Sequence, residues 1–125
     1  MTVTPGNSEG VAEIAFALML SGARKIPQAN SYVKNKEWMH RTDRSTFLGV
    51  ELSQKTLGII GLGRIGSIVA RIGKGFDMKL VYYDLERNKR LEDELSIMYL
   101  PLEQLLTESD FFNSCPIDKR NKRIN

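Results

Sequence analysis

Three glycines and one aspartate in the middle of the chain have the residue types and the spacing of a dinucleotide-binding site. Gly61, Gly63 and Gly66 form the pattern Gly-x-Gly-x-x-Gly, and Asp84 follows the next apolar run. Gly61 permits a tight turn, Gly63 lets the backbone approach a pyrophosphate, and Gly66 lets a helix pack close to the preceding strand. Asp84 stands where a carboxylate can accept hydrogen bonds from both ribose hydroxyls of an adenosine. This arrangement predicts NAD as the cofactor, in preference to NADP.

Two strands and a helix must position these residues. The apolar run Leu57, Ile59 and Ile60 is typical of a strand buried on both faces, and residues 79–83 form the next strand, which Asp84 ends. The helix that begins after the glycines directs its N-terminal N–H groups at the pyrophosphate. Glycine also serves in ordinary tight turns, and Asp is a common turn former. The combination of strand, glycine turn, helix, strand and acid favours the nucleotide site over these alternatives.

The remaining apolar segments extend the same alternation. We expect a helix within 86–94, a third strand at 97–100, a helix that starts at Pro101 and a fourth strand at 110–115. The predicted fold is therefore α/β, a Rossmann-type doubly wound parallel sheet that makes up about half of a full nucleotide-binding domain. In such a sheet the strands at Ile97, Lys79, Thr56 and Asp110 lie side by side in that order.

Helices are expected before the nucleotide-binding unit. A turn at residues 4–6 precedes a helix that Asn7 or Ser8 can cap, and a second helix opens at Pro27. We expect a polar surface loop, anchored by Trp38, to follow. The apolar residues of the first helix recur at helical spacing, and they are Val11, Ile14, Ala15 and Leu18, with Ala12 and Ala17 beside them. The predicted division is an arm and loop at 1–48, a half-domain at 49–118 and a basic tail at 119–125.

Charge and composition exclude several classes of function. The net charge is +3, and residues 118–125 carry all of it, so the body of the chain has no basic field for nucleic acid. The apolar window 11–20 contains Glu13, is too short to span a membrane, and lacks the basic start and cleavage pattern of a signal peptide. Cys115 is the only cysteine, which excludes an internal disulfide and a cysteine-based metal cluster. We expect a cytoplasmic protein with no metal site, no nucleic-acid partner and no membrane partner.

Several motifs together resemble a known family. They are TPGNSEGVAE, ARKIPQANSYVKNKEW, GVELSQKTLGIIGLGRIG, YYD and PLEQLLTESDFF. In this order they are similar to the D-isomer-specific 2-hydroxyacid dehydrogenases, the group that includes phosphoglycerate and glyoxylate dehydrogenases. The resemblance runs from about Thr4 to Pro116, which is nearly the whole chain.

The resemblance implies an NAD-dependent oxidoreductase that transfers a hydride between nicotinamide and a 2-hydroxy or 2-keto acid. Arg64 and Ile65 would then contact the pyrophosphate through the loop, Asp84 would hold the adenine ribose, and Cys115 and Pro116 would lie beside the cofactor. The resemblance further implies a homodimer formed through the segment from Asn7 to Trp38. In the family, the equivalent segment crosses between two domains and contributes to a dimer interface.

The chain departs from the family pattern at both ends. Family members carry a substrate-binding domain before this region, and their catalytic Arg, Glu and His lie beyond its last residue. The segment 113–118 is shorter than its family equivalent and lacks the usual histidine. We therefore expect a fragment in which no catalytic residue can be assigned. The alternative is a noncatalytic fragment that dimerises or binds NAD without turnover, and cofactor binding by the purified chain tests whether the nucleotide site is functional.

Three other residues could carry chemistry but have simpler interpretations. His40, the only histidine, lies in the polar loop and is expected to be solvated. Cys115 has no histidine near it in sequence, so packing beside the cofactor is the better interpretation than nucleophilic catalysis. Arg87 follows Asp84 closely and could suggest a site for the 2′-phosphate of NADP, but the Asp84 carboxylate would repel that phosphate.

Overall fold

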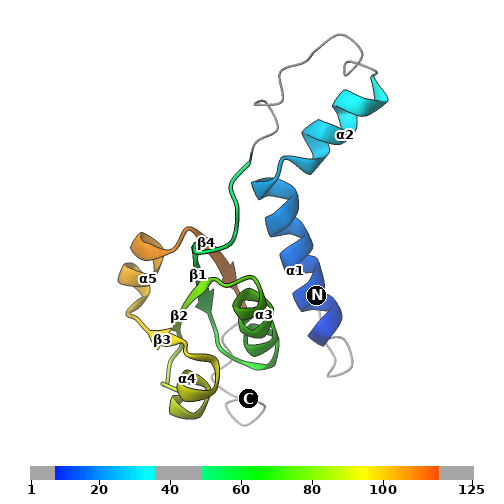
Figure 1. The fold of residues 1–125 in the computed structure, drawn as a ribbon. Coiled ribbons are helices and arrows are strands. Elements are labelled where there is room, and N and C mark those ends of the chain that lie inside the picture. Colours follow the sequence, from blue (N-terminus) through cyan, green and yellow to red (C-terminus); the bar gives the residue numbers. More distant parts are fainter. Residues whose placement is uncertain (1–7, 36–48, 116–125) are drawn as a thin grey trace.

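The computed structural model describes residues 8–35 and 49–115. Their helices and strands alternate along the chain after two initial helices (Figure 1). In order they are α1 (Ser8–Ala23), α2 (Ile26–Lys34), β1 (Thr56–Ile60), α3 (Arg64–Gly75), β2 (Lys79–Tyr83), α4 (Lys89–Leu95), β3 (Met98–Tyr99), α5 (Leu102–Glu108) and β4 (Phe111–Ser114). The Asn7 cap, the Trp38 loop, His40, Pro116 and the basic tail fall outside these residues.

The four strands form one parallel sheet in the order β3-β2-β1-β4. Leu57 of β1 lies opposite Leu80 of β2 on one side and opposite Phe111 of β4 on the other. This is the predicted α/β fold with the predicted strand order. Strand β1 is central because the chain moves outward from it to β2 and β3, and then returns to the opposite side of β1 to form β4.

Helices cover both faces of the sheet (Figure 1). Alternate residues of β1 and β2 face the layer that contains α3, α4 and part of α1, and their core includes Leu57, Ile59, Leu80, Tyr82, Leu91 and Leu95. The other face packs against α5 through a smaller cluster, in which Val81, Leu100 and Leu105 are buried. Because both faces are covered, the central strands are apolar runs and not alternating ones.

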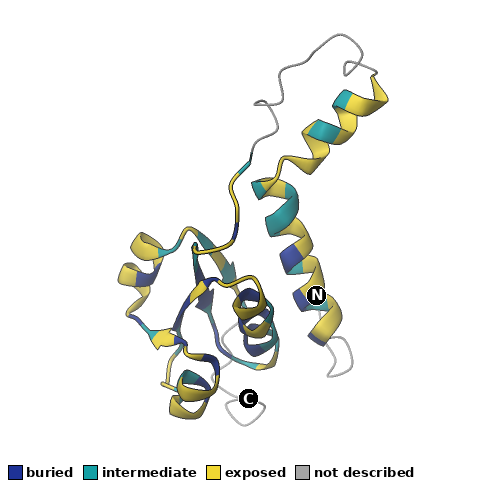
Figure 2. Cartoon of the chain, in the orientation of Figure 1, coloured by how far each residue is buried: buried dark blue, intermediate teal, exposed yellow. Residues whose placement is uncertain are grey.

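The packed face of α1 agrees with the predicted one only in part. Ala12 is buried and Ala15 packs against the core, as predicted. Phe16, which was not predicted, is also buried, and its ring stacks on Phe76 at the end of α3 with 5.6 Å between centroids. Ile14 and Leu18 of the predicted face are 60% and 69% exposed. Helix α1 is apolar around most of its circumference, so spacing alone did not select the face. Figure 2 shows the buried positions of α1 on its side toward the sheet, and α2 largely exposed.

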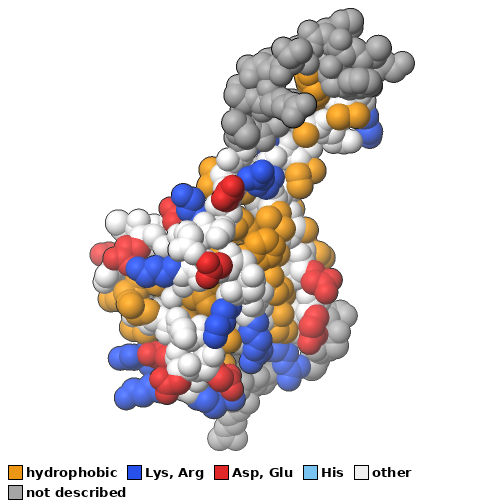
Figure 3. Space-filling model, in the orientation of Figure 1, with side chains coloured by type: hydrophobic (Ala, Val, Ile, Leu, Met, Phe, Trp, Pro, Cys, Tyr) orange, Lys and Arg blue, Asp and Glu red, His pale blue; other side chains and the backbone are white. Residues whose placement is uncertain are grey.

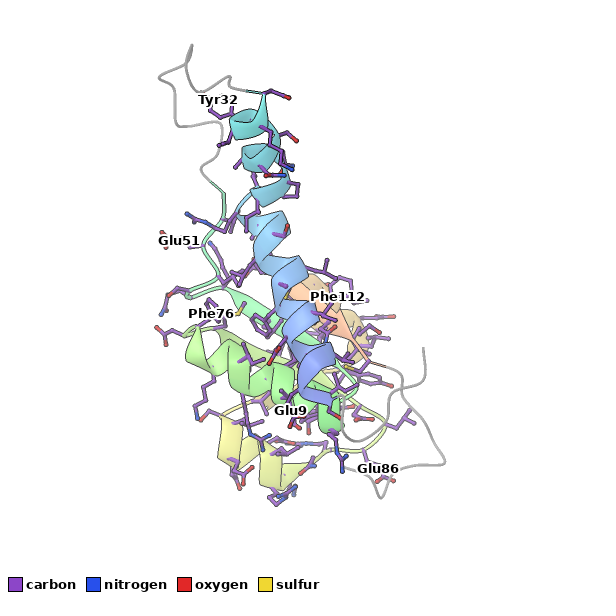
Figure 4. All side chains as sticks on the ribbon, turned by 90° about the vertical axis from the view of Figure 1, so that its right-hand side faces the viewer. Glu9, Tyr32, Glu51, Phe76, Glu86 and Phe112 are labelled. Atoms are coloured by element: carbon purple, nitrogen blue, oxygen red, sulfur yellow. The ribbon has the colours of Figure 1, made fainter. Side chains whose placement is uncertain are left out.

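Helix α2 extends away from the sheet. It begins after Lys25, has Pro27 in its first turn as expected for a proline that needs no N–H partner there, and contains no buried residue. Figure 4 shows Tyr32 on this helix, at the end of the arm remote from the sheet. Within 8–35 and 49–115, no helix has the length and apolar character needed to cross a membrane.

Candidate dinucleotide site

Gly61 makes the turn that leaves the central strand. Its φ angle is +92°, a conformation that residues with a side chain rarely adopt. Its N–H donates to the carbonyl oxygen of Tyr83 at 2.8 Å, which ties the end of β1 to the end of β2. A Cβ placed on Gly61 would lie 2.9 Å from the carbonyl oxygen of Cys115. The predicted role of Gly61 in a tight turn is therefore seen, and the turn also borders the end of β4.

Gly66 brings α3 close to the strand that precedes it. A Cβ at this position would lie 2.2 Å from the carbonyl oxygen of Gly61 and 3.2 Å from Cγ2 of Ile59. The first of these atoms belongs to the backbone, so it cannot move aside easily. This close approach is the role predicted for the third glycine.

Gly63 immediately precedes α3 and provides no side-chain cap. Its carbonyl oxygen accepts the N–H of Ser67 at 2.8 Å, the first hydrogen bond of the helix. Among the residues that the structure describes, none accepts a hydrogen bond from the backbone N–H of Arg64 or Ile65. Such N–H groups at the start of a helix bind anions, aided by the helix dipole.

The two residues predicted to contact the pyrophosphate, Arg64 and Ile65, differ in how far their side chains are exposed. The Arg64 side chain is exposed, whereas that of Ile65 packs against the core. The backbone N–H is therefore the polar group that Ile65 can offer a ligand, while Arg64 can also offer its guanidinium. Sequence reasoning did not single out Ser67, whose buried hydroxyl donates to the carbonyl oxygen of Arg64 at 2.9 Å and so supports the first turn.

The Asp84 carboxylate is turned toward the glycine loop. Its Oδ2 accepts the backbone N–H of Leu62 at 2.9 Å, and its Oδ1 accepts the N–H of Leu85 at 2.7 Å. An ionised carboxylate has about four acceptor positions, so two bonds leave capacity for two ribose hydroxyls. The sequence predicted the acid but not its contact with Leu62, because that contact depends on how β2 ends beside the loop.

Cys115 lies where β4 ends beside Gly61. Its N–H donates to the carbonyl oxygen of Ile60 at 2.8 Å, and its half-buried Sγ lies 3.5 Å from Nδ2 of Asn113. Burial raises the pKa of the Cys115 thiol, and the Asn113 amide opposes this only in part. The thiol therefore stays protonated near neutral pH, which suits packing better than nucleophilic attack.

These residues meet where the parallel strands have their carboxyl ends. Gly61 follows β1, Asp84 follows β2 and Cys115 follows β4, so all three lie at the carboxyl ends of parallel strands. The chain leaves β1 toward β2 on one side, and β4 occupies the other side. A crevice at such a reversal of strand order is the usual ligand site in open α/β sheets. The structure thus brings together five predicted residues, Gly61, Gly63, Gly66, Asp84 and Cys115, with Arg64 and Ile65 on the adjoining helix.

A polar network joins the end of β2 to α4, and sequence reasoning missed it. The Tyr82 hydroxyl donates to Oε2 of Glu92 at 2.8 Å and accepts the N–H of Asn88 at 2.8 Å. Burial raises the pKa of Tyr82 to about 12. Glu92 also accepts two hydrogen bonds from the Arg87 guanidinium, and Arg87, followed by Tyr82, lowers the pKa of Glu92. The sequence signal that could have predicted this network is a tyrosine in the second strand followed by a carboxylate in the next helix.

An open groove of about 480 Å³ lies elsewhere, where the end of α1 meets the segment that leads to β1. Its lining consists of Leu18, Met19, Gly22, Ala23, Lys25, Gly49, Val50 and Phe111. None of the predicted cofactor residues borders this groove. Figure 3 shows apolar side chains gathered in the same region along α1.

Comparison with known families agrees with this geometry. The family model described as D-isomer specific 2-hydroxyacid dehydrogenase, NAD binding domain, matches residues 16–124. A glyoxylate reductase of Korarchaeum cryptofilum is 46% identical over 112 residues, which cover 89% of this chain and 34% of the reductase. The chain therefore spans about a third of the length of the glyoxylate reductases that it matches.

Solved structures show the same fold. The D-lactate dehydrogenase of Aquifex aeolicus, in a complex with NAD and lactic acid, superposes with a TM-score of 0.81 and 35% identity, covering 94% of this chain and 34% of that one. An acyclic imino acid reductase in complex with NADPH and D-Arg gives a TM-score of 0.77 and 30% identity, covering 90% of this chain and 34% of the other.

Proposed function

This chain belongs to the family of D-isomer specific 2-hydroxyacid dehydrogenases, within its NAD-binding domain, and from that premise we propose that the glycine turn and Asp84 bind NAD. The observation that carries the proposal is the orientation of Asp84. Its carboxylate already faces the loop through Leu62, while the glycines keep side chains away from the same edge of the sheet.

We assign each residue a separate role in binding. The N–H groups that begin α3, at Arg64 and Ile65, hold the pyrophosphate, and Asp84 accepts the ribose hydroxyls. Gly61 and Gly63 keep the backbone accessible, while Cys115 borders the cofactor at the end of β4. Bound NAD supplies the acceptor or donor of a hydride. These residues orient it, because a fixed backbone loop and a fixed carboxylate leave the dinucleotide little freedom.

The complete enzyme is proposed to transfer a hydride between NAD(H) and a 2-hydroxy or 2-keto acid. Glyoxylate reductase and D-lactate dehydrogenase, the names of proteins similar to this chain, support this substrate class. The family resemblance assigns the catalytic Arg, Glu and His to a region beyond the matched segment. No catalytic residue is proposed within residues 1–125.

A homodimer formed through the arm, and a cytoplasmic location, belong to the same proposal. Ile14 and Leu18 on α1, and Ile26 and Val33 on α2, leave large apolar side chains exposed. Apolar residues exposed along one arm are typical of surfaces that a partner subunit covers. We also propose the division into an arm at 1–48 and a nucleotide-binding unit at 49–118, because all strands of the sheet in the described residues follow residue 49.

Cofactor binding can be tested with two matched aspartate variants. Asp84→Ala should weaken NADH binding by about 1–3 kcal/mol, as expected when charge-assisted hydrogen bonds are lost. Asp110→Ala is the control, because Asp110 also accepts a backbone N–H, that of Thr56 at 2.8 Å, but at the amino ends of the strands. Calorimetric titration should show NADH affinity reduced only by Asp84→Ala. Equal losses in both variants, or no NADH binding by the unmodified chain, would contradict the proposed site.

A further inference from the structure

The guanidinium of Arg87, three residues past Asp84 in sequence, is held by one carboxylate and one ring. Its Nη2 lies 2.7 Å from Oε1 of Glu92 and its Nε lies 3.2 Å from Oε2. The guanidinium carbon also lies 5.5 Å from the centre of the Tyr99 ring. A two-point contact with a carboxylate fixes the plane of the guanidinium as well as its position.

Glu92 is itself held in place by a buried tyrosine. Its Oε2 accepts the hydroxyl of Tyr82, a fully buried residue of β2, and that hydroxyl accepts the N–H of Asn88. The Glu92 side chain is only 15% exposed, whereas that of Arg87 is 55% exposed. Arg87 therefore contacts a preorganised acceptor, which makes the pair stronger than a contact between two mobile surface side chains.

Asp84 and Arg87 are directed to opposite sides of β2. The Asp84 carboxylate accepts the N–H of Leu62 in the loop that follows β1. The Arg87 guanidinium lies over Tyr99 of β3, the strand on the other side of β2. The cation nearest in sequence to the ribose-binding carboxylate is thus retained on the side away from the proposed cofactor crevice.

We propose that Glu92 is a positioning residue for cofactor selectivity, because it retains Arg87 where the guanidinium cannot pair with a 2′-phosphate. The inference rests on the proposed NAD site. Arginine is the side chain best suited to a phosphate, and its release three residues from Asp84 would place it within reach of the ribose. The fold does not forbid NADPH, since the imino acid reductase of similar fold holds that cofactor. The choice between NADH and NADPH therefore depends on residues near the ribose. Asp84 and Glu92 both contribute to that choice.

The experiment compares NADH and NADPH dissociation constants for the whole chain and four variants by calorimetry. Glu92→Gln keeps the size of the side chain and an acceptor for Tyr82 but removes the charge that holds Arg87. It should lower the ratio of the NADPH to the NADH dissociation constant by about fivefold, the upper range for an exposed ion pair. Glu94→Gln is the charge control, since Glu94 lies on the same helix and pairs with Arg71 at 3.8 Å. It should leave the ratio unchanged.

Two arginine variants separate positioning from a general structural effect. Arg87→Gln alone should leave both dissociation constants within about twofold of the unmodified chain, because the retained guanidinium contacts neither cofactor. Arg87→Gln combined with Glu92→Gln should abolish the gain in NADPH affinity. An unchanged ratio in Glu92→Gln, a matching change in Glu94→Gln, or a gain that survives loss of Arg87 would overturn the inference. Absence of NADH binding in the unmodified chain would instead reject the proposed site, and this inference with it.

Discussion

The backbone N–H of Leu62 and the carboxylate of Asp84 form a hydrogen bond of 2.9 Å that joins the glycine loop to the end of the neighbouring strand. The proposed site assigns the pyrophosphate to the loop and the ribose to the acid, so this bond fixes the separation of those two groups. A site whose parts are already in place loses less conformational entropy when its ligand binds. Arg87 pairs with Glu92, and within the described residues no ion pair joins it to Asp84.

The close approach of α3 to β1 predicts opposite effects for two glycine substitutions in the same helix. Gly66→Ala should lower the free energy of unfolding by about 1–3 kcal/mol, because its Cβ would meet the carbonyl oxygen of Gly61 at 2.2 Å. Gly75→Ala has no atom within 4 Å of the new Cβ and should be neutral or stabilising by up to about 1 kcal/mol. Urea unfolding of both variants measures the difference. Equal stability would show that the backbone adjusts without cost.

Tyr82 predicts a specific loss of stability at alkaline pH. Burial raises its pKa from 10.0 to about 12, so an unfolded chain releases this proton at lower pH than the folded one. The contribution is complete below about pH 10 and is lost as pH rises toward 12. Tyr82→Phe should cost about 1–3 kcal/mol at neutral pH, because Asn88 and Glu92 lose a partner, but its stability should decline less steeply above pH 10. Parallel declines for both proteins in urea unfolding would contradict the assignment.

The position of β4 predicts self-association of the isolated chain. Within the described residues β4 pairs only with β1, and Phe112 on this edge strand is 56% exposed. An edge with unpaired backbone groups and an exposed aromatic residue is a template for pairing with another chain, and lysine on such an edge opposes it. Phe112→Lys should reduce association in sedimentation experiments, whereas Leu106→Lys on α5 should not. An unmodified chain that stays monomeric in all sedimentation experiments would count against this interpretation.

Turnover by residues 1–125 alone should remain at background. Reduction of a 2-keto acid requires a cation that holds the carboxylate and an acid that protonates the developing alkoxide. The family resemblance assigns both to a region beyond the matched segment. The measurement is the loss of NADH absorbance with a panel of 2-keto acids, including glyoxylate and pyruvate. Turnover that disappears in Asp84→Ala would reveal an active site within this chain.

The sequence by itself determined the strand order, the three glycine positions and the acid at the end of β2. These features are readable because each depends on local chemistry. Positive φ at Gly61 needs glycine, a buried strand needs an apolar run, and a right-handed crossover leaves few possible strand orders.

Only the tertiary structure decided which contacts those elements make. Helix α1 carries apolar residues around most of its circumference, and the position of Phe76 selected Phe16 for burial while Ile14 remained exposed. The bond from Leu62 to Asp84 and the retention of Arg87 by Glu92 each join residues on different elements. Sequence spacing does not specify which donor meets which acceptor, because these partners meet only after the sheet and its helices have packed.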